Sequence, residues 1–183
     1  MLHAGFFYVL SSYGDIFIVT AKDTLQSKAT EFKFHLAKNA EFETLYFDNT
    51  LNKLILICKG CKQDKKKDVS TFAFDISTQT FLNGPFVIDA DKTAALLNEN
   101  KIKFKPSAAA INPVTHELFI LSSVSKALVI ADRSGNIKSV YGLNPSLYKQ
   151  PEGITFTPAG DLLISNESAK QGMANIFILR NKK

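Results

Sequence analysis

The sequence lacks tryptophan, contains only two cysteines and has no long uninterrupted apolar stretch. A membrane-spanning helix needs about 20 consecutive apolar residues, so no segment is predicted to be one. The glycine patterns of phosphate-binding loops, Gly-x-Gly-x-x-Gly and Gly-x-x-x-x-Gly-Lys-Ser/Thr, are also missing, which argues against a nucleotide enzyme. No Gly-x-Ser-x-Gly segment singles out a nucleophilic serine.

The net charge of +5 at pH 7 comes in part from one loop and from the chain end. Lys62 and residues 65–67 supply four of the 22 basic residues, and Lys182 and Lys183 supply two more. A surface that follows a nucleic-acid backbone needs basic side chains spread over it and interleaved with aromatic ones. We therefore expect a solvated loop here and no nucleic-acid partner.

Phenylalanine dominates the aromatic residues, with 15 copies beside 5 tyrosines. Aromatic side chains fill pleated sheet surfaces well, and short strand-like segments bounded by turn residues recur along the chain. Residues 89–100 differ, because Asp89 stands at a capping position before an Ala-Ala-Leu-Leu run, which is the pattern of a short surface helix. The sequence predicts an all-β chain with one helical insertion.

A strand–turn–strand unit occurs three times, over residues 43–56, 107–120 and 152–164. The second and third units start 45 residues apart, about the length of a four-stranded propeller blade. The first two start 64 residues apart, and the helical insertion accounts for the excess. Solenoid repeats of this length usually carry a helix or a shorter strand ladder, so the repeat favours a β-propeller.

We therefore predict one β-propeller domain over residues 1–183, built from antiparallel four-stranded blades. The first unit offers strands at 6–11, 16–21 and 30–36 but no innermost strand, and the last unit ends after its third strand. The expected repeat units are 3–38, 40–88, 105–146 and 150–183, with the helix inserted at 89–100. Equivalent positions of the three repeats are expected in the packing between blades, namely Leu54, Leu56, Leu118, Ile120, Leu162 and Ile164.

The count of three and a half to four blades is at or below the lower end of the usual range for propellers. An open arc leaves sheet edges exposed, and exposed edges pair readily with other strands. No secretory signal is recognisable at Met1. We therefore expect a chain that either lacks blades on its N-terminal side or dimerises through its exposed blade edges.

Two segments of the chain carry a family resemblance. Residues 150–156, Gln-Pro-Glu-Gly-Ile-Thr-Phe, are followed by Gly-Asp-Leu-Leu-Ile-Ser-Asn-Glu at 160–167, and the run at 104–113 leads to a similar strand at 118–123. Together they resemble the SdiA-regulated (YjiK-like) family over most of residues 40–183. The sequence departs from the family at Ala108 and Ala109, where a glycine is usual.

The resemblance implies a six-bladed propeller that is exported or associated with the cell envelope. It also implies a bound calcium ion. It implies no established enzymatic activity. The blades expected to be absent from the N-terminal side and the departure at 108–109 both bear on whether a central site is complete.

The candidate ligands lie where the innermost strands begin, near the central channel of a propeller. Glu43, Ser107 and Glu152 occupy this equivalent position, and Glu167 follows at the end of the next strand. Calcium takes six to eight oxygen ligands, so these four residues are the predicted metal ligands. The alternative is that the carboxylates cap strand ends and accept backbone hydrogen bonds.

Cys58 and Cys61 form a single Cys-x-x-Cys motif at a strand end. A structural zinc site needs two further Cys or His ligands, and His3, His35 and His116 show no paired spacing. A redox dithiol usually belongs to a βαβ unit, which the sequence lacks. Cys58 and Cys61 could form a disulfide or remain two independent thiols. The sequence favours independent thiols.

These observations favour a non-catalytic binding or scaffolding propeller of the cell envelope, whose partner is a protein or a small molecule. The alternative is a divalent-metal-dependent hydrolase similar to gluconolactonase, in which a central metal activates water. There, Glu43 or Glu152 would be a metal ligand and a neighbouring Asp or Asn the base.

Overall fold

The computed structural model describes residues 1–20, 29–64, 67–99, 102–168 and 173–181. Within these ranges the chain forms four antiparallel sheets and one short helix. In each sheet the strands lie side by side in chain order. The predicted all-β architecture is confirmed.

The four sheets are named blades 1 to 4 in chain order. Blade 1 contains β1 (Leu2–His3), β2 (Phe6–Leu10), β3 (Ile16–Thr20) and β4 (Thr30–Phe32). Blade 2 contains β5 (Ala40–Asp48), β6 (Lys53–Cys61), β7 (Asp68–Asp75) and β8 (Thr80–Asp89). Blade 3 contains β9 (Pro106–Ile111), β10 (Leu118–Ser122), β11 (Ala127–Ala131) and β12 (Ile137–Gly142). Blade 4 contains β13 (Pro151–Phe156), β14 (Leu162–Asn166) and β15 (Asn175–Leu179).

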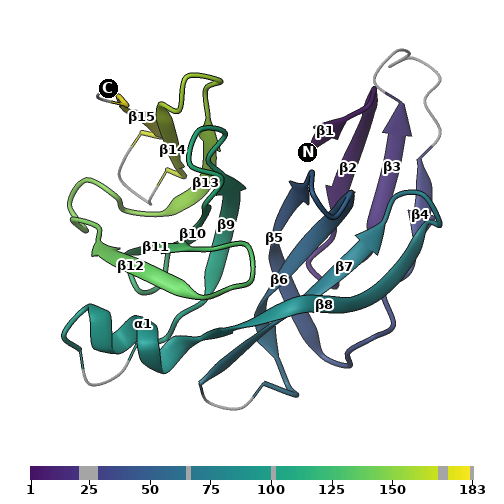
Figure 1. The fold of residues 1–183 in the computed structure, drawn as a ribbon, viewed down its shortest axis with the longest axis horizontal. Helices are drawn as coiled ribbons and strands as arrows, with labels where there is room; N and C mark the ends of the chain where they lie inside the picture. The colour runs from purple at the N-terminus through teal and green to yellow at the C-terminus, as the bar shows by residue number, and fades with distance from the viewer. Residues whose placement is uncertain (21–28, 65–66, 100–101, 169–172, 182–183) are drawn as a thin grey trace.

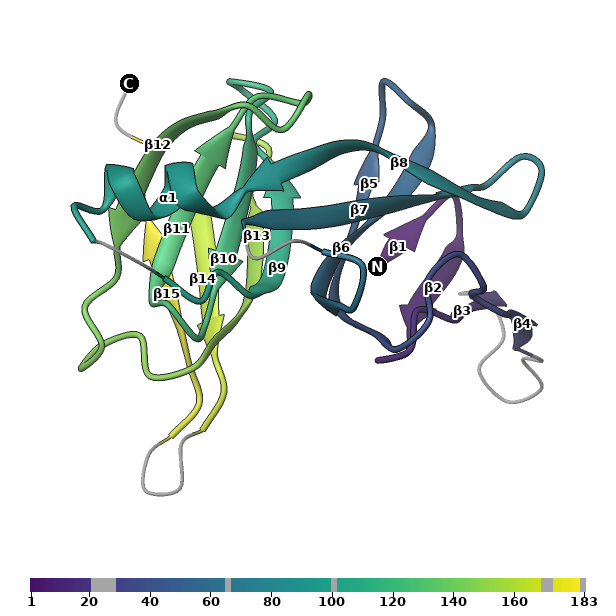
Figure 2. The same ribbon diagram turned by 90° about the horizontal axis from the view of Figure 1, so that it is seen from below.

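The blades are arranged as part of a β-propeller (Figures 1 and 2). The innermost strands β5, β9 and β13 contact one another in sequence and lie toward the middle of the molecule, whereas β4, β12 and β15 lie at the periphery. Blades 2 and 3 thus each present one face to the blade before them and the other to the blade after them. No helix in the described ranges is long and apolar enough to cross a membrane.

The innermost position of blade 1 is filled, contrary to the expectation that its inner strand is absent. The two-residue strand β1 pairs with β2, with Leu2 opposite Phe7 and His3 opposite Phe6. The imidazole of His3 stacks on Phe47 of blade 2, with 3.8 Å between ring centroids. A strand this short carries little alternation signal, which explains why the sequence pattern missed it.

The helical insertion is α1 (Ala90–Leu96), which begins where the sequence predicts. The Asp89 carboxylate accepts hydrogen bonds from the backbone N–H groups of Asp91 and Lys92, the usual role of an N-cap. The helix ends at Leu96, with Leu97 as its C-cap, and residue 100 lies outside the described ranges. The helix packs against β12, so it covers an outer part of blade 3 (Figure 1).

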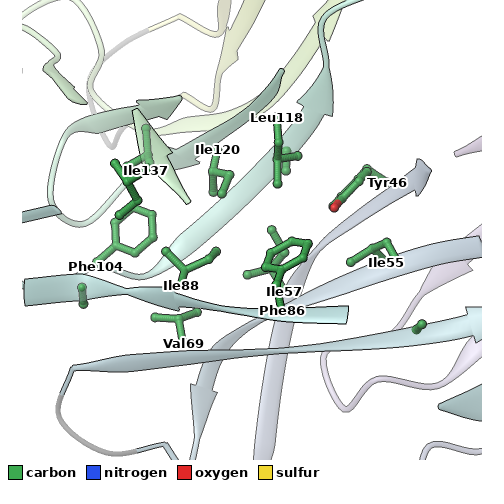
Figure 3. Packing of buried hydrophobic residues seen from close by; sticks show 14 residues of the cluster. Tyr46, Ile55, Ile57, Val69, Phe86, Ile88, Phe104, Leu118, Ile120 and Ile137 are labelled. Carbon is green, nitrogen blue, oxygen red and sulfur yellow. The ribbon is translucent and has the colours of Figure 1, made fainter. Parts of the chain in front are cut away.

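The core consists of three clusters, each between two adjacent blades. The six side chains expected to pack between blades are all buried, and in each pair they face the preceding blade: Leu54, Leu56, Leu118, Ile120, Leu162 and Ile164. Figure 3 shows Leu118 and Ile120 pointing toward Ile57 and Ile88 of blade 2. The predicted repeat register is therefore confirmed.

An ion pair links blades 2 and 3 beside this core. Asp48, at the end of β5, is 1% exposed and accepts hydrogen bonds from the N–H groups of Thr50 and Leu51 at 3.0 and 2.9 Å. Arg133, in the turn between β11 and β12, reaches the same carboxylate with its Nε 3.2 Å from Oδ2. Its NH2 group also contacts Asp48. The pair joins residues that are 85 positions apart.

The outer faces of blades 1 and 4 carry exposed apolar side chains. Leu2, Phe7 and Val9 are exposed on blade 1, and Ile176 and Ile178 on blade 4. These faces have no neighbouring blade within the described ranges. Exposed apolar surface of this kind can mark an interaction site. Dimerisation through exposed blade edges stays a prediction.

Candidate functional site

A β-bulge lies near the start of the innermost strand in each of blades 2, 3 and 4. The cross-strand pairing omits Glu43 on β5, Ser107 on β9 and Glu152 on β13. A bulge leaves one residue unpaired and redirects its side chain, and bulges are frequent next to functional sites. The three equivalent positions of the sequence repeat are thus also structurally equivalent.

The bulged residues meet at one pocket of about 610 Å³, which we call the inner pocket. Glu43, Ser107 and Glu152 line it, and Glu167 does so as well. The structure therefore brings together all four residues that the sequence singled out. Further polar side chains in its wall are Ser12, Lys59, Lys105, Ser123 and Gln150. The use of the four residues as calcium ligands stays a prediction.

Lys59 is a pocket residue that sequence reasoning missed. The pairing of β6 with β5 omits it, and its Nζ lies 2.5 Å from Glu43 Oε1 and 2.9 Å from Glu41 Oε1. Hydrogen bonds to these two carboxylates raise the pKa of Lys59, and the one to Glu41 lowers the pKa of that glutamate. Glu43 therefore already has a cation beside it.

Ser107 has a structural role in addition to lining the pocket. It is 3% exposed, and its hydroxyl donates a hydrogen bond to the Pro151 carbonyl at 2.8 Å. This contact joins the innermost strands of blades 3 and 4. The hydroxyl proton is committed to the Pro151 carbonyl, so Ser107 can offer only oxygen lone pairs to a ligand.

Glu152 is the most perturbed acid of the inner pocket. Burial raises its pKa, and the nearby charges of Glu43 and Glu167 raise it further, while a hydrogen bond from Ser123 and the charge of Lys59 act in the opposite direction. The Glu167 N–H donates to the Gln150 carbonyl at 2.9 Å, which holds that second carboxylate at the pocket wall. Burial and the two neighbouring carboxylates thus disfavour the charged form of Glu152, and Lys59 offsets this in part.

These contacts decide which residues fit a hard cation. Glu43 is already paired with Lys59, whereas Ser107 donates its proton to a carbonyl and keeps its oxygen lone pairs for a ligand. Glu152 and Glu167, with the oxygen atoms of Ser123 and Gln150 in the same wall, are the residues that would hold calcium. Within the described residues, the carboxylates of Glu43, Glu152 and Glu167 do not form a group whose oxygens all lie within 4.8 Å.

The two cysteines form a disulfide, so the expectation of independent thiols is wrong. The bulge at Lys59 brings the ends of the Cys-x-x-Cys segment to the same side of β6, with 6.0 Å between Cα atoms. This separation lies within the usual range for disulfides. The three-residue spacing alone did not reveal the bulge.

The hydrolase alternative requires an Asp or Asn base beside the metal. Among the described residues that line the inner pocket, none is an aspartate or asparagine. The remaining acid–base groups there are the three glutamates and two lysines, and one lysine is held by Glu43. The base that this alternative names is therefore not found among the described residues of the inner pocket.

Comparisons with known proteins agree with this architecture. The SdiA-regulated family matches residues 16–170. No curated protein matches the sequence. A nutrient-binding protein from Bacteroides ovatus has a similar structure with a TM-score of 0.55 and 10% sequence identity, and the match covers 97% of this chain and 39% of that one.

A putative 6-phosphogluconolactonase from Bacteroides uniformis is also similar, with a TM-score of 0.53 and 7% identity over 96% of this chain and 54% of that protein. At these identities the likeness concerns the fold alone. The chain spans only 39% to 62% of the length of the first three solved structures that it resembles.

Proposed function

This chain belongs to the SdiA-regulated family, and on that premise we propose that it is a non-catalytic binding propeller of the cell envelope. Its partner, a small polar molecule or a protein segment, binds at the inner pocket. The proposal rests on the three bulges at Glu43, Ser107 and Glu152. In three successive blades the same backbone irregularity places one side chain in the wall of the same pocket.

The mixed charge of the inner pocket supports a polar ligand. Lys59 and Lys105 offer ammonium donors, whereas Glu152 and Glu167 offer carboxylate acceptors. Serine hydroxyls and the Gln150 amide supply both kinds of group. Such a wall suits a ligand with several hydrogen-bonding groups better than an apolar one.

Calcium is part of the proposal, with Glu152 and Glu167 as the protein carboxylates that hold it. A divalent cation would offset the charge of these two carboxylates, and calcium accepts irregular sets of oxygen ligands. Lys59 already neutralises Glu43. The calcium ion would therefore bind Glu152 and Glu167.

Glu152→Gln tests this assignment. Because the folded-state pKa of Glu152 is raised, its ionisation costs folded-state stability, and this cost appears as the pH rises through that pKa. In chelator at neutral pH, the variant should therefore melt above the wild type. Calcium at a hundredfold excess over its Kd should stabilise the wild type by about 2.7 kcal/mol, roughly 5–10 °C, and the variant much less.

The measurement is a melting curve in calcium, in magnesium and in chelator. Magnesium should stabilise the wild type less than calcium, because it demands stricter octahedral geometry. Glu99→Gln, at an exposed position outside the inner pocket, is the matched control and should respond to calcium as the wild type does. Identical wild-type curves in calcium and chelator would contradict the calcium assignment.

The hydrolase alternative is tested separately with lactone substrates in the presence of divalent metals. We expect no hydrolysis above that of a heat-denatured sample. Turnover that disappears in Glu152→Gln would overturn the non-catalytic proposal.

A further inference from the structure

A second group of potential ligands lies in a different pocket of the molecule. The Sγ atoms of Cys58 and Cys61 and a carboxylate oxygen of Asp64 all lie within 4.8 Å of one another. Among the described residues, this is the one group of three metal-ligating side chains that are so close. Its third member was not apparent from the Cys-x-x-Cys motif.

The local backbone explains how Asp64 reaches the cysteines. The bulge at Lys59 brings Cys58 and Cys61 to the same side of β6. The chain then turns, and the Asp64 N–H donates to the Cys61 carbonyl at 3.0 Å. The turn places the Asp64 side chain beside the two sulfur atoms.

The surroundings hold Asp64 in place. The backbone N–H of Ser70 lies 3.3 Å from both carboxylate oxygens, and the Ser70 hydroxyl donates to Oδ1. Hydrogen bonds of this kind orient ligating carboxylates at metal sites and are a regular part of their design.

The three side chains line a pocket of about 510 Å³, which we call the disulfide pocket. Cys58 and Cys61 are 1% and 8% exposed, so the protein closes one side of the group while the pocket opens on the other. Lys59, Lys103 and Lys105 also line it. Nearby ammonium groups stabilise thiolates, and they offset the negative charge of a site with two thiolates and one carboxylate.

We propose that the reduced Cys58–Cys61 pair and Asp64 form a zinc site whose fourth position faces the disulfide pocket. A dithiol reductant breaks the Sγ–Sγ bond, gives two electrons and two protons to the cysteines and leaves as its own disulfide. Zinc then displaces one proton from each thiol. Two sulfurs and one oxygen are ligands that zinc accepts, at the two-residue spacing typical of its cysteine pairs.

This inference does not depend on the proposed function, because Cys58, Cys61 and Asp64 do not line the inner pocket. In the oxidised form each sulfur is bonded to the other and carries no negative charge. Reduction gives two thiols, which lose their protons and bind a metal as thiolates. The site is therefore available only after reduction.

The experiment uses the full chain, reduced with a dithiol and freed of it under anaerobic conditions. Titration with zinc should give one ion per reduced chain and none per oxidised chain. Cobalt(II) added to the reduced protein should produce a thiolate-to-cobalt charge-transfer band in the near ultraviolet. This readout needs no variant.

Three variants assign the ligands. Asp64→Asn keeps the shape and the contact with the Ser70 N–H and should weaken zinc binding at least about 10-fold. Asp68→Asn, which changes another acid of the same pocket, is the matched control and should bind as the wild type does. The double variant Cys58→Ser, Cys61→Ser should bind no zinc and show no charge-transfer band.

The proposal is overturned if the reduced wild type binds zinc no more tightly than the double variant. It is also overturned if Asp64→Asn and Asp68→Asn bind alike, since Asp64 would then not be a ligand. Equal uptake by the oxidised and reduced forms would rule out the dithiol as the site.

Discussion

Replacement of Leu118 by alanine should lower the free energy of unfolding by about 2–5 kcal/mol. Leu118 is 0% exposed and packs in the cluster between blades 2 and 3, near Ile57 and Ile88 (Figure 3). The truncation removes apolar contacts and leaves a cavity between two sheets, which can close only if the blades shift. Interior side chains pack densely, so the neighbours relax only in part.

Urea denaturation measures this effect, with Leu147→Ala as the matched control. Leu147 is 52% exposed, and its truncation should change the free energy of unfolding by less than about 0.5 kcal/mol. If both variants lost the same free energy of unfolding, the core between blades 2 and 3 would not be the main source of the stability of these blades.

Arg133→Met should destabilise the protein by about 3 kcal/mol, the lower end of the range for a broken buried ion pair. The variant leaves the Asp48 carboxylate buried without its cation. The lower end applies because two backbone N–H groups still bind this carboxylate and because the Arg133 side chain is 23% exposed. The interactions that are weakened should be those at the junction of blades 2 and 3.

Two further variants make this prediction specific. Adding Asp48→Asn to Arg133→Met should recover part of the loss, because the double variant no longer buries an unpaired charge. Arg180→Met is the matched control: Arg180 pairs with Asp161 at 2.7 Å, but its side chain is 72% exposed, and such pairs contribute at most about 1 kcal/mol. Similar losses for Arg133→Met and Arg180→Met would contradict the role assigned to burial.

Lys59 connects the two pockets. It lines both of them, it lies between Cys58 and Cys61 in the sequence, and its ammonium holds Glu43 in the inner pocket. Events at the cysteines thus occur one residue away from the cation of the inner pocket. The two proposals are nevertheless measured independently, one by calcium and one by zinc.

Patterns in the sequence predict the propeller architecture, the inter-blade core and the start of the helix. These features depend on local or periodic patterns: alternation assigns Leu54 and Leu118 to the buried face of a strand, and Asp89 before a helical run is an N-cap. The repeat also aligned Glu43 with Glu152, because equivalent residues of repeated units take equivalent places.

The contacts that these residues make depend on how the blades pack together. The partners of Glu43, Asp48 and the cysteine pair are side chains brought close by bulges, turns and blade packing, and the Arg133 that reaches Asp48 lies 85 positions away. No periodic pattern encodes such contacts, because each depends on where a single side chain points after the sheets have packed. The bulge at Lys59 is the clearest case, since one omitted cross-strand pair both permits the disulfide and places a lysine on the predicted ligand Glu43.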